Sequence, residues 1–231
     1  MSGTQLALGV RLRDDARWAN FHGGRNATAA GMVRNACGDP AHPLVVLCGD
    51  EDTGKSHLLQ AACHEYEQRG QSAVCFSLAE LEPLGPDALS GVEVMDLVAL
   101  DDVHRVLGKP AWEEALFHLY NRARDLGHQV MLTLNDTPVR QSFVLPDLRS
   151  RFQEGLLVQL GTYRDDDRIT ILRLRAEQRG LVLSDEVAGF ILRRSSRRLG
   201  ALLAILDQLD ENSLQAQRRL TIPFIKSVMG W

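Results

Sequence analysis

The chain has 231 residues, of which 45% are hydrophobic and 24% charged, with a formal net charge of −4 at pH 7. These proportions are typical of a globular protein with one ordinary domain and a small second one. The charge excludes a global basic field for nucleic acid or acidic membranes, and no apolar run is long enough to span a bilayer.

The first strong feature along the chain is a glycine-rich loop between an expected strand and an expected helix. Residues 42–48, "HPLVVLC", are apolar and β-rich, and residues 55–70, "KSHLLQAACHEYEQRG", are helical in pattern and end at Gly70. Between them stands G-x-x-x-x-G-K-S, the phosphate-loop signature. The residues predicted to hold nucleotide here are Gly49, Asp50, Glu51, Asp52, Thr53, Gly54, Lys55, Ser56 and His57.

The fixed positions of this motif each have a chemical reason. The glycines allow backbone angles that bring N–H groups together on a phosphate, and the helix adds its positive end. Lys55 supplies a cation for the β- and γ-phosphates, and Ser56 supplies a hydroxyl ligand for Mg²⁺. The motif therefore predicts ADP or ATP with Mg²⁺ as the cofactor. A ligand-free glycine turn is the alternative that the motif alone leaves open.

Further strands and helices alternate after this loop. Strands are predicted at 72–76, 96–102, 129–134 and 156–160, and an amphipathic helix at 110–127 between Pro110 and Gly127. This alternation predicts an α/β fold with a five-stranded, mostly parallel sheet that helices cover on both faces.

After Gly161 the pattern changes to helices alone, at 165–180, 184–196, 198–217 and 222–229. We therefore expect a tail at 1–12, an α/β nucleotide-binding base at 13–161 and a small all-helical lid at 162–231. The four cysteines show no C-x-x-C spacing, which favours buried free thiols and a reducing cytoplasm.

Carboxylates follow two of the predicted strands. Asp101 and Asp102 end the "LVALDD" run, and we predict that Asp101 binds Mg²⁺ and Asp102 orients a water molecule. Their alternative role is to cap a helix. Asn135 and Asp136 follow the next strand and come beside the γ-phosphate if the strand order is the usual one; otherwise they form an ordinary turn.

The order of these features resembles the AAA+ ATPases of the DnaA clade, and within that clade the Hda subfamily of regulatory inactivators. The resemblance extends along nearly the whole chain and implies an AAA+ base with a helical lid. It is carried by "TQLALGV", "GKSHLLQAAC", "LYNRARDLG", "LPDLRSRF", "LDQLD" and "QRRLTIPFIKSVM".

The resemblance implies a regulator that holds nucleotide, by preference ADP, and accelerates ATP hydrolysis on the DnaA initiator. It implies that Arg151, in "LRSRF", enters the partner's ATP site as an arginine finger; a salt-bridged surface arginine is the alternative. The tail string "QLALGV" resembles the family's motif for the DNA polymerase sliding clamp, the β subunit. The implied clamp-binding residues are Gln5, Leu6, Leu8 and Val10.

Two departures from the family pattern argue for weak or absent intrinsic ATPase activity. Gly200 stands where the family's lid has an arginine, with Arg197 and Arg198 as candidate substitutes, and Asp102 is shorter than the usual glutamate.

Because no helix-turn-helix segment follows the lid, we expect no direct sequence-specific DNA binding. A homodimer or higher oligomer stays open. The alternative functions are a self-acting AAA+ ATPase, such as a helicase loader or DNA-remodelling factor, and a plain adaptor between clamp and partner.

Overall fold

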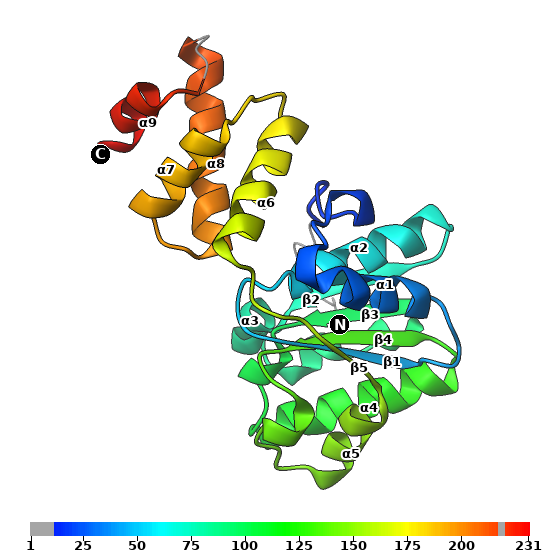
Figure 1. Ribbon diagram of the computed structural model, residues 1–231. Helices are drawn as coiled ribbons and strands as arrows, with labels where there is room; N and C mark the ends of the chain where they lie inside the picture. The colour runs from blue at the N-terminus through cyan, green and yellow to red at the C-terminus, as the bar shows by residue number, and fades with distance from the viewer. Residues whose placement is uncertain (1–11, 217–219) are drawn as a thin grey trace, which may run out of the picture. The chain divides into compact units, whose positions relative to one another are not determined.

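The computed structural model describes residues 12–216 and 220–231. The implied clamp-binding residues Gln5, Leu6, Leu8 and Val10 lie outside these ranges. By internal packing the described chain divides into two compact units (Figure 1), one of residues 12–21 and 28–160 and the other of residues 22–27, 161–216 and 220–231. The short segment 22–27 thus packs with the C-terminal helices rather than with the sheet.

The first unit is built on a parallel sheet of five strands within the described residues, in the order β2-β3-β4-β1-β5 (Figure 1). The strands are β1 Leu44–Cys48, β2 Ala73–Ser77, β3 Leu97–Asp101, β4 Gln129–Leu134 and β5 Leu156–Gln159. Every pair is parallel, which confirms the predicted α/β class. Because β4 lies between β3 and β1, the carboxyl ends of these three strands meet at one edge.

Helices cover both faces of the sheet. On one face lie α1 (Ala27–Ala36) and α2 (Lys55–Gln68), and on the other lie α3 (Leu78–Leu81), α4 (Pro110–Asp125) and α5 (Pro146–Glu154). Side chains alternate along β1, so Val45 and Leu47 face α2, whereas Leu44, Val46 and Cys48 face α4 and α5. The strand is apolar throughout because both of its faces are buried.

Besides the short helix α3, two larger parts of this unit are absent from the sequence-based prediction. One is α1, an alanine-rich helix that buries only three small or medium side chains and contains Gly31. The other is a run of short 3-10 turns between α3 and β3, at Glu82–Leu84, Pro86–Leu89 and Val92–Val94. Neither part has the long apolar stripe that identifies a helix from sequence.

The second unit is all-helical, with α6 (Asp165–Gln178), α7 (Asp185–Arg194), α8 (Leu199–Ala216) and α9 (Ile222–Met229) around a core that includes Leu172, Ile191 and Leu206. The predicted lid helices are confirmed. The segment 22–27 joins this unit through Asn26, whose side chain donates to the carbonyl of Gly161 (2.9 Å) and accepts from its N–H (2.8 Å).

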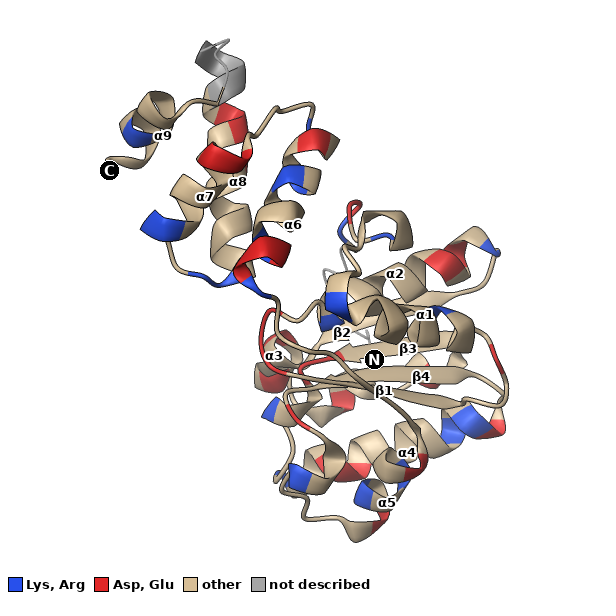
Figure 2. Cartoon of the chain, viewed as in Figure 1, with Lys and Arg blue, Asp and Glu red and all other residues tan. Residues whose placement is uncertain are grey.

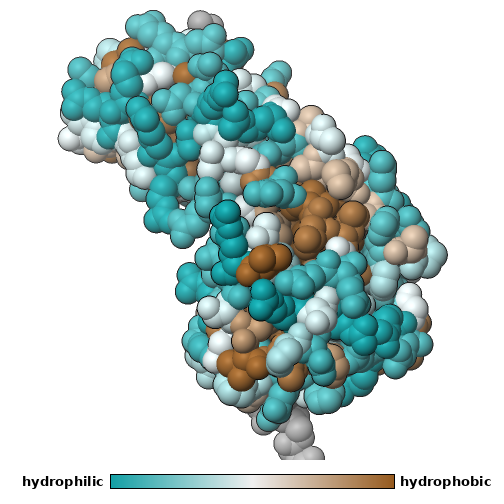
Figure 3. Space-filling view, turned by 60° about the horizontal axis from the view of Figure 1, so that its bottom comes forward, coloured by the Kyte–Doolittle hydropathy of each residue, from teal (hydrophilic) through white to brown (hydrophobic). Residues whose placement is uncertain are grey.

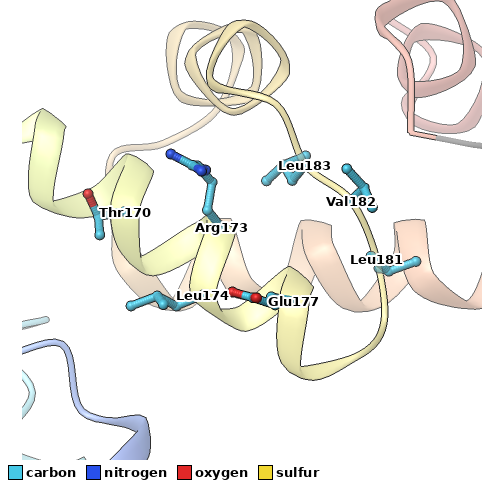
Figure 4. A pocket seen from close by; sticks show the side chains of 7 residues that line it. All are labelled: Thr170, Arg173, Leu174, Glu177, Leu181, Val182 and Leu183. Atoms are coloured by element: carbon cyan, nitrogen blue, oxygen red, sulfur yellow. The ribbon is translucent and has the colours of Figure 1, made fainter.

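The second unit carries a pocket of about 350 Å³ between α6 and the segment that leads to α7 (Figure 4). No residue that the sequence predicts to bind nucleotide belongs to its lining. The lining residues are Thr170, Arg173, Leu174, Glu177, Leu181, Val182 and Leu183.

A single buried amide ties several elements of the first unit together. Gln129 begins β4 and is 4% exposed. Its Nε2 donates to the carbonyls of Ala36 and His42, each at 2.7 Å. Its Oε1 accepts from the N–H of Gly38 (3.1 Å) and from the hydroxyl of Tyr66 (2.9 Å). The end of α1, the loop before β1, and α2 are therefore all bonded to the first residue of β4.

We predict that Gln129→Leu lowers the free energy of unfolding by about 2–4 kcal/mol, because it leaves buried donors and acceptors unpaired. Urea-induced unfolding measures the difference. The control is Gln68→Leu at the exposed end of α2, which we expect to change stability by less than about 0.5 kcal/mol. Equal stability of wild type and Gln129→Leu would show that these hydrogen bonds make no net contribution.

Candidate nucleotide site

The loop between β1 and α2 has a shape that requires glycine. Gly49 has φ +153°, and a Cβ on it would lie 2.6 Å from the carbonyl oxygen of Leu160. Gly54 has φ +95° and precedes α2, and its position gives that helix no side-chain cap. The first N–H groups of α2 therefore point into the loop without a capping side chain, which is the arrangement that suits an anion.

Lys55 is enclosed by the loop to which it belongs. Its side chain Nζ donates to the carbonyls of Gly49 and Asp50, each at 2.6 Å, and the residue is 8% exposed. Burial lowers the pKa of the Lys55 ammonium, and the carboxylates of Asp101 and Asp102 act in the opposite direction. The ammonium and the two carboxylates at the end of β3 therefore act on one another electrostatically.

The other loop residues differ in exposure. Thr53 is fully buried and its Oγ1 donates to the carbonyl of Asp50 (2.9 Å), which braces the loop. Glu51 and Ser56 are exposed, and Asp52 is half-buried with φ +60°. The loop therefore leaves the Ser56 hydroxyl open to solvent at the start of α2.

Thr133 holds the carboxylate at the end of β3. Its Oγ1 donates to Oδ1 of Asp101 (2.5 Å) and accepts from the N–H of Asp102 (2.8 Å), and Thr133 is fully buried. Asp102 has φ +57°; among the described residues, it and Asp52 are the non-glycine positions with positive φ. Thr133 is a site residue that sequence reasoning missed, although a lone hydroxyl within the apolar "QVMLTL" strand is a signal for it.

Asn135 and Asp136 follow β4 beside the phosphate loop. Their side chains accept hydrogen bonds from residues of the turn that follows. Oδ1 of Asp136 accepts from the N–H of Thr137 (2.7 Å), and this bond is the main cause that lowers the Asp136 pKa. Oδ1 of Asn135 accepts from Nε2 of Gln141 (2.7 Å). The strand order is the one that brings these residues next to β1. Figure 2 shows acidic residues in the loops at this end of the sheet.

His57 connects the start of α2 to the segment before α1. Its Nε2 lies 2.9 Å from the carbonyl oxygen of Arg17, and its ring lies 5.4 Å from that of Phe21. Two turns later Nε2 of His64 lies 3.1 Å from the carbonyl oxygen of Arg13. The residues that immediately follow the N-terminal tail are therefore held along α2.

Arg151 lies on the opposite side of the sheet from α2. It belongs to α5, which buries Leu148 and Phe152 against the α4 face. The Arg151 guanidinium pairs with Glu154 at 3.2 Å, and its side chain is 34% exposed. Arg149 is exposed and, by helical geometry, projects about 200° away around α5. The structure therefore brings Lys55, Asp101 and Asp102 together and leaves Arg151 apart from them.

The candidate lid arginines lie in the second unit. Arg197 is exposed and its guanidinium is 3.5 Å from a carboxylate oxygen of Asp165, and Arg198 is exposed at the start of α8. Arg168 also pairs with Asp165, at 3.2 Å, and its Nε is buried without a hydrogen-bond partner in the described structure.

The remaining predictions concern metal clusters, cysteines and membrane spans. Within the ranges 12–216 and 220–231, no group of three or more His, Cys, Asp or Glu side chains is arranged to hold a metal ion. Across the same ranges, no helix has the length and apolar character needed to cross a bilayer. All four cysteines are free; Cys37, Cys48 and Cys63 are buried and Cys75 is half-buried.

Comparison with known proteins matches two families to this chain. The family described as "Hda, lid domain" matches residues 165–229, and "Bacterial DnaA ATPase domain" matches residues 90–159. An uncharacterized protein of Haemophilus influenzae is 39% identical over 227 residues, which cover 98% of each chain. This chain is an Hda-like member of the DnaA-clade AAA+ proteins.

Solved structures of DnaA proteins have the same fold. Domain III of the Thermotoga maritima replication initiation protein DnaA has a TM-score of 0.81 at 22% identity, covering 95% of this chain and 98% of that one. DnaA from Aquifex aeolicus, solved bound to AMPPCP, has a TM-score of 0.70 at 25% identity, covering 89% of this chain and 69% of that one. The Hda-like chain therefore has the AAA+ base and C-terminal helical lid that the sequence resemblance implies.

We predict that ADP raises the melting temperature of the wild-type protein but not that of Lys55→Ala, which lacks the cation that faces the phosphates. A ligand at 100 times its Kd stabilises the native state by about 2.7 kcal/mol. Differential scanning fluorimetry with and without ADP measures the shift. Lys109→Ala is the control, because the Lys109 ammonium pairs with Glu82 rather than with the loop carbonyls. An equal ADP shift in wild type and Lys55→Ala would place the nucleotide elsewhere.

Proposed function

We propose that this Hda-like protein is a clamp-tethered negative regulator of DNA replication initiation. It holds a nucleotide in its own phosphate loop and supplies Arg151 to the ATP site of the DnaA initiator, where it accelerates hydrolysis. The observation that carries the proposal is the separation of these two features: Lys55 lies on the α2 face of the sheet and Arg151 on the α5 face. An arginine so placed suits a neighbouring protein's nucleotide better than its own.

The protein's own site fits a bound ADP or ATP with Mg²⁺. The loop N–H groups and Lys55 would face the phosphates, and the Ser56 hydroxyl and Asp101 carboxylate would bind the metal. Thr133 engages one oxygen of Asp101 and leaves the other for the cation. Asp102 has a short side chain on a left-handed backbone, which supports slow hydrolysis of the resident nucleotide and a holding role.

The surroundings of Arg151 support contact with another protein. Its ion pair with Glu154 is an exposed pair on one helix, which contributes little stability and is readily exchanged for a phosphate. In the segment that leads to α5, Val139 is 62% exposed and Val144 is 55% exposed. Figure 3 shows that hydrophobic residues form separate patches on a mostly hydrophilic surface. Exposed apolar side chains in the segment before α5 would add contact area for a partner that Arg151 reaches.

The tail would act as a tether that raises the local concentration of the regulator on clamp-loaded DNA, in the cytoplasm. The complete phosphate loop and the adjacent Asp101 also fit the alternative, a self-acting AAA+ ATPase. Steady-state ATP hydrolysis without DnaA, measured with and without single-stranded DNA, separates the two. Rapid turnover of the isolated protein would favour the alternative.

We predict that Arg151→Ala abolishes the stimulation of DnaA-bound ATP hydrolysis. A guanidinium can stabilise the charge that develops on the γ-phosphoryl oxygens, and fingers supplied by a partner accelerate related hydrolases by about 10³–10⁵-fold. Arg151→Lys should be nearly as defective, because lysine keeps the charge but lacks the planar fork of donors. The measurement is the hydrolysis of ATP on preloaded DnaA with clamp on DNA.

The matched control for this assay is Arg149→Ala, since Arg149 lies on the same helix and points about 200° away. We expect it to retain wild-type stimulation. Full activity of Arg151→Ala, in a protein that still folds and binds the clamp, would refute the finger.

We predict that replacing Gln5, Leu6 and Leu8 by alanine abolishes co-purification with the sliding clamp and leaves the melting temperature unchanged. The leucines would insert into an apolar groove and the glutamine would hydrogen-bond beside it, so the fold does not depend on them. Clamp pull-down and thermal denaturation of both proteins check this. A stable clamp complex of the triple variant would exclude the tail as the tether.

A further inference from the structure

Glu113 is a fully buried carboxylate that the proposed function does not yet use. It lies in the first turn of α4, among the residues that this helix buries, and its exposed fraction is 0%. A buried carboxylate is costly unless hydrogen-bond donors satisfy it. The identity of those donors therefore indicates which segments of the chain Glu113 holds in place.

The donors are backbone N–H groups of two loops. Oε1 of Glu113 accepts from the N–H of Gly108 (2.7 Å) and from that of Val144 (3.1 Å). Oε2 accepts from the N–H of Val144 (2.9 Å) and from that of Leu145 (2.6 Å). One carboxylate thus joins the turn before α4 to the segment before α5, where Val144 lies 31 residues after Glu113 in the chain.

The segment that Glu113 holds is the start of α5. Leu145 is the N-cap residue of that helix and provides no side-chain cap, and Pro146 follows in its first turn. Phe143 packs edge-on against Phe152, with ring centroids 5.6 Å apart. A helix of nine residues is too short to be stable alone, so its direction depends on these contacts.

We propose that Glu113 is the positioning residue for Arg151. The carboxylate fixes the N-cap residue of α5, Leu145, and Arg151 follows about one and a half helical turns later. A tilt of the helix at Leu145 therefore displaces the guanidinium. A misplacement of about 1 Å can cost about 100-fold in a reaction that depends on orientation. This inference rests on the proposed function, in which Arg151 enters the ATP site of a partner.

The test compares Glu113→Gln with Glu114→Gln, the same chemical change on the next, exposed residue of α4. A carboxamide keeps the size of glutamate but turns an NH₂ toward one of the N–H donors. By amide hydrogen exchange, we expect the protection of Val144 and Leu145 to fall by about 10-fold or more in Glu113→Gln. The amides of α2 and the affinity for ADP should not change, and Glu114→Gln should match the wild type.

The functional arm measures hydrolysis of ATP on clamp-tethered DnaA over a range of regulator concentrations. We expect Glu113→Gln to lower the maximal stimulated rate by about 10–100-fold, with a much smaller change in the concentration for half-stimulation. Combined with Arg151→Ala, it should cause no loss beyond that of Arg151→Ala alone, because both changes remove one interaction. A general loss of stability would instead lower the protection of the α2 amides together with that of Val144 and Leu145.

Glu113→Asp serves as the second variant. It keeps the charge on a shorter side chain, so we expect stimulation between those of wild type and Glu113→Gln, and it decides the question if Glu113→Gln does not fold. Wild-type stimulation by both Glu113 variants, alongside a defective Arg151→Ala, would overturn the positioning role only. Wild-type stimulation by Arg151→Ala would overturn the proposed function, and the positioning role with it; amide exchange would then show separately whether Glu113 holds α5.

Discussion

The site depends on one topological constraint, the parallel pairing of β4 with both β1 and β3. Parallel strands end at the same edge, so three loops that are far apart in sequence meet there. The first contains Lys55, the second Asp101 and Asp102, and the third Asp136. A lysine on a surface helix would have none of these neighbours. Its burial and its loop carbonyl bonds follow from the strand order rather than from the motif alone.

This edge of the sheet brings more carboxylates than ammonium groups close together. The carboxylates of Asp50, Asp101 and Asp102 all raise the pKa of Lys55, whereas burial lowers it. A polyphosphate would therefore approach a region that is already acidic, and Lys55 alone would not balance the added charge. A divalent cation between phosphate oxygens and Asp101 removes this repulsion, which is the physical reason to expect nucleotide and metal to bind together.

The parts predictable from sequence are those set by local patterns. All five strands lie within about two residues of their predicted ranges, because short apolar runs between turn residues define them. The hydrogen bonds of Thr133 to Asp101 and of Glu113 to Val144 each join residues more than 30 positions apart. A polar residue inside an apolar strand or helix indicates only that some partner exists. The partner's identity requires the tertiary fold.

The buried Glu113 also shows how a short helix can be made rigid without a large core. Helix α5 buries Leu148 and Phe152 only, and such a pair leaves a helix free to tilt about its apolar contact. Glu113 adds hydrogen bonds from the N–H groups of Val144 and Leu145, which fix the N-terminal end of α5. If the loop before α5 moved away, the buried Glu113 carboxylate would lose hydrogen-bond donors. Because a buried carboxylate without donors is unfavourable, such a movement would raise the free energy of the folded protein. The start of α5 is therefore held by these hydrogen bonds in addition to its apolar contacts, which fixes the direction of the helix that carries Arg151.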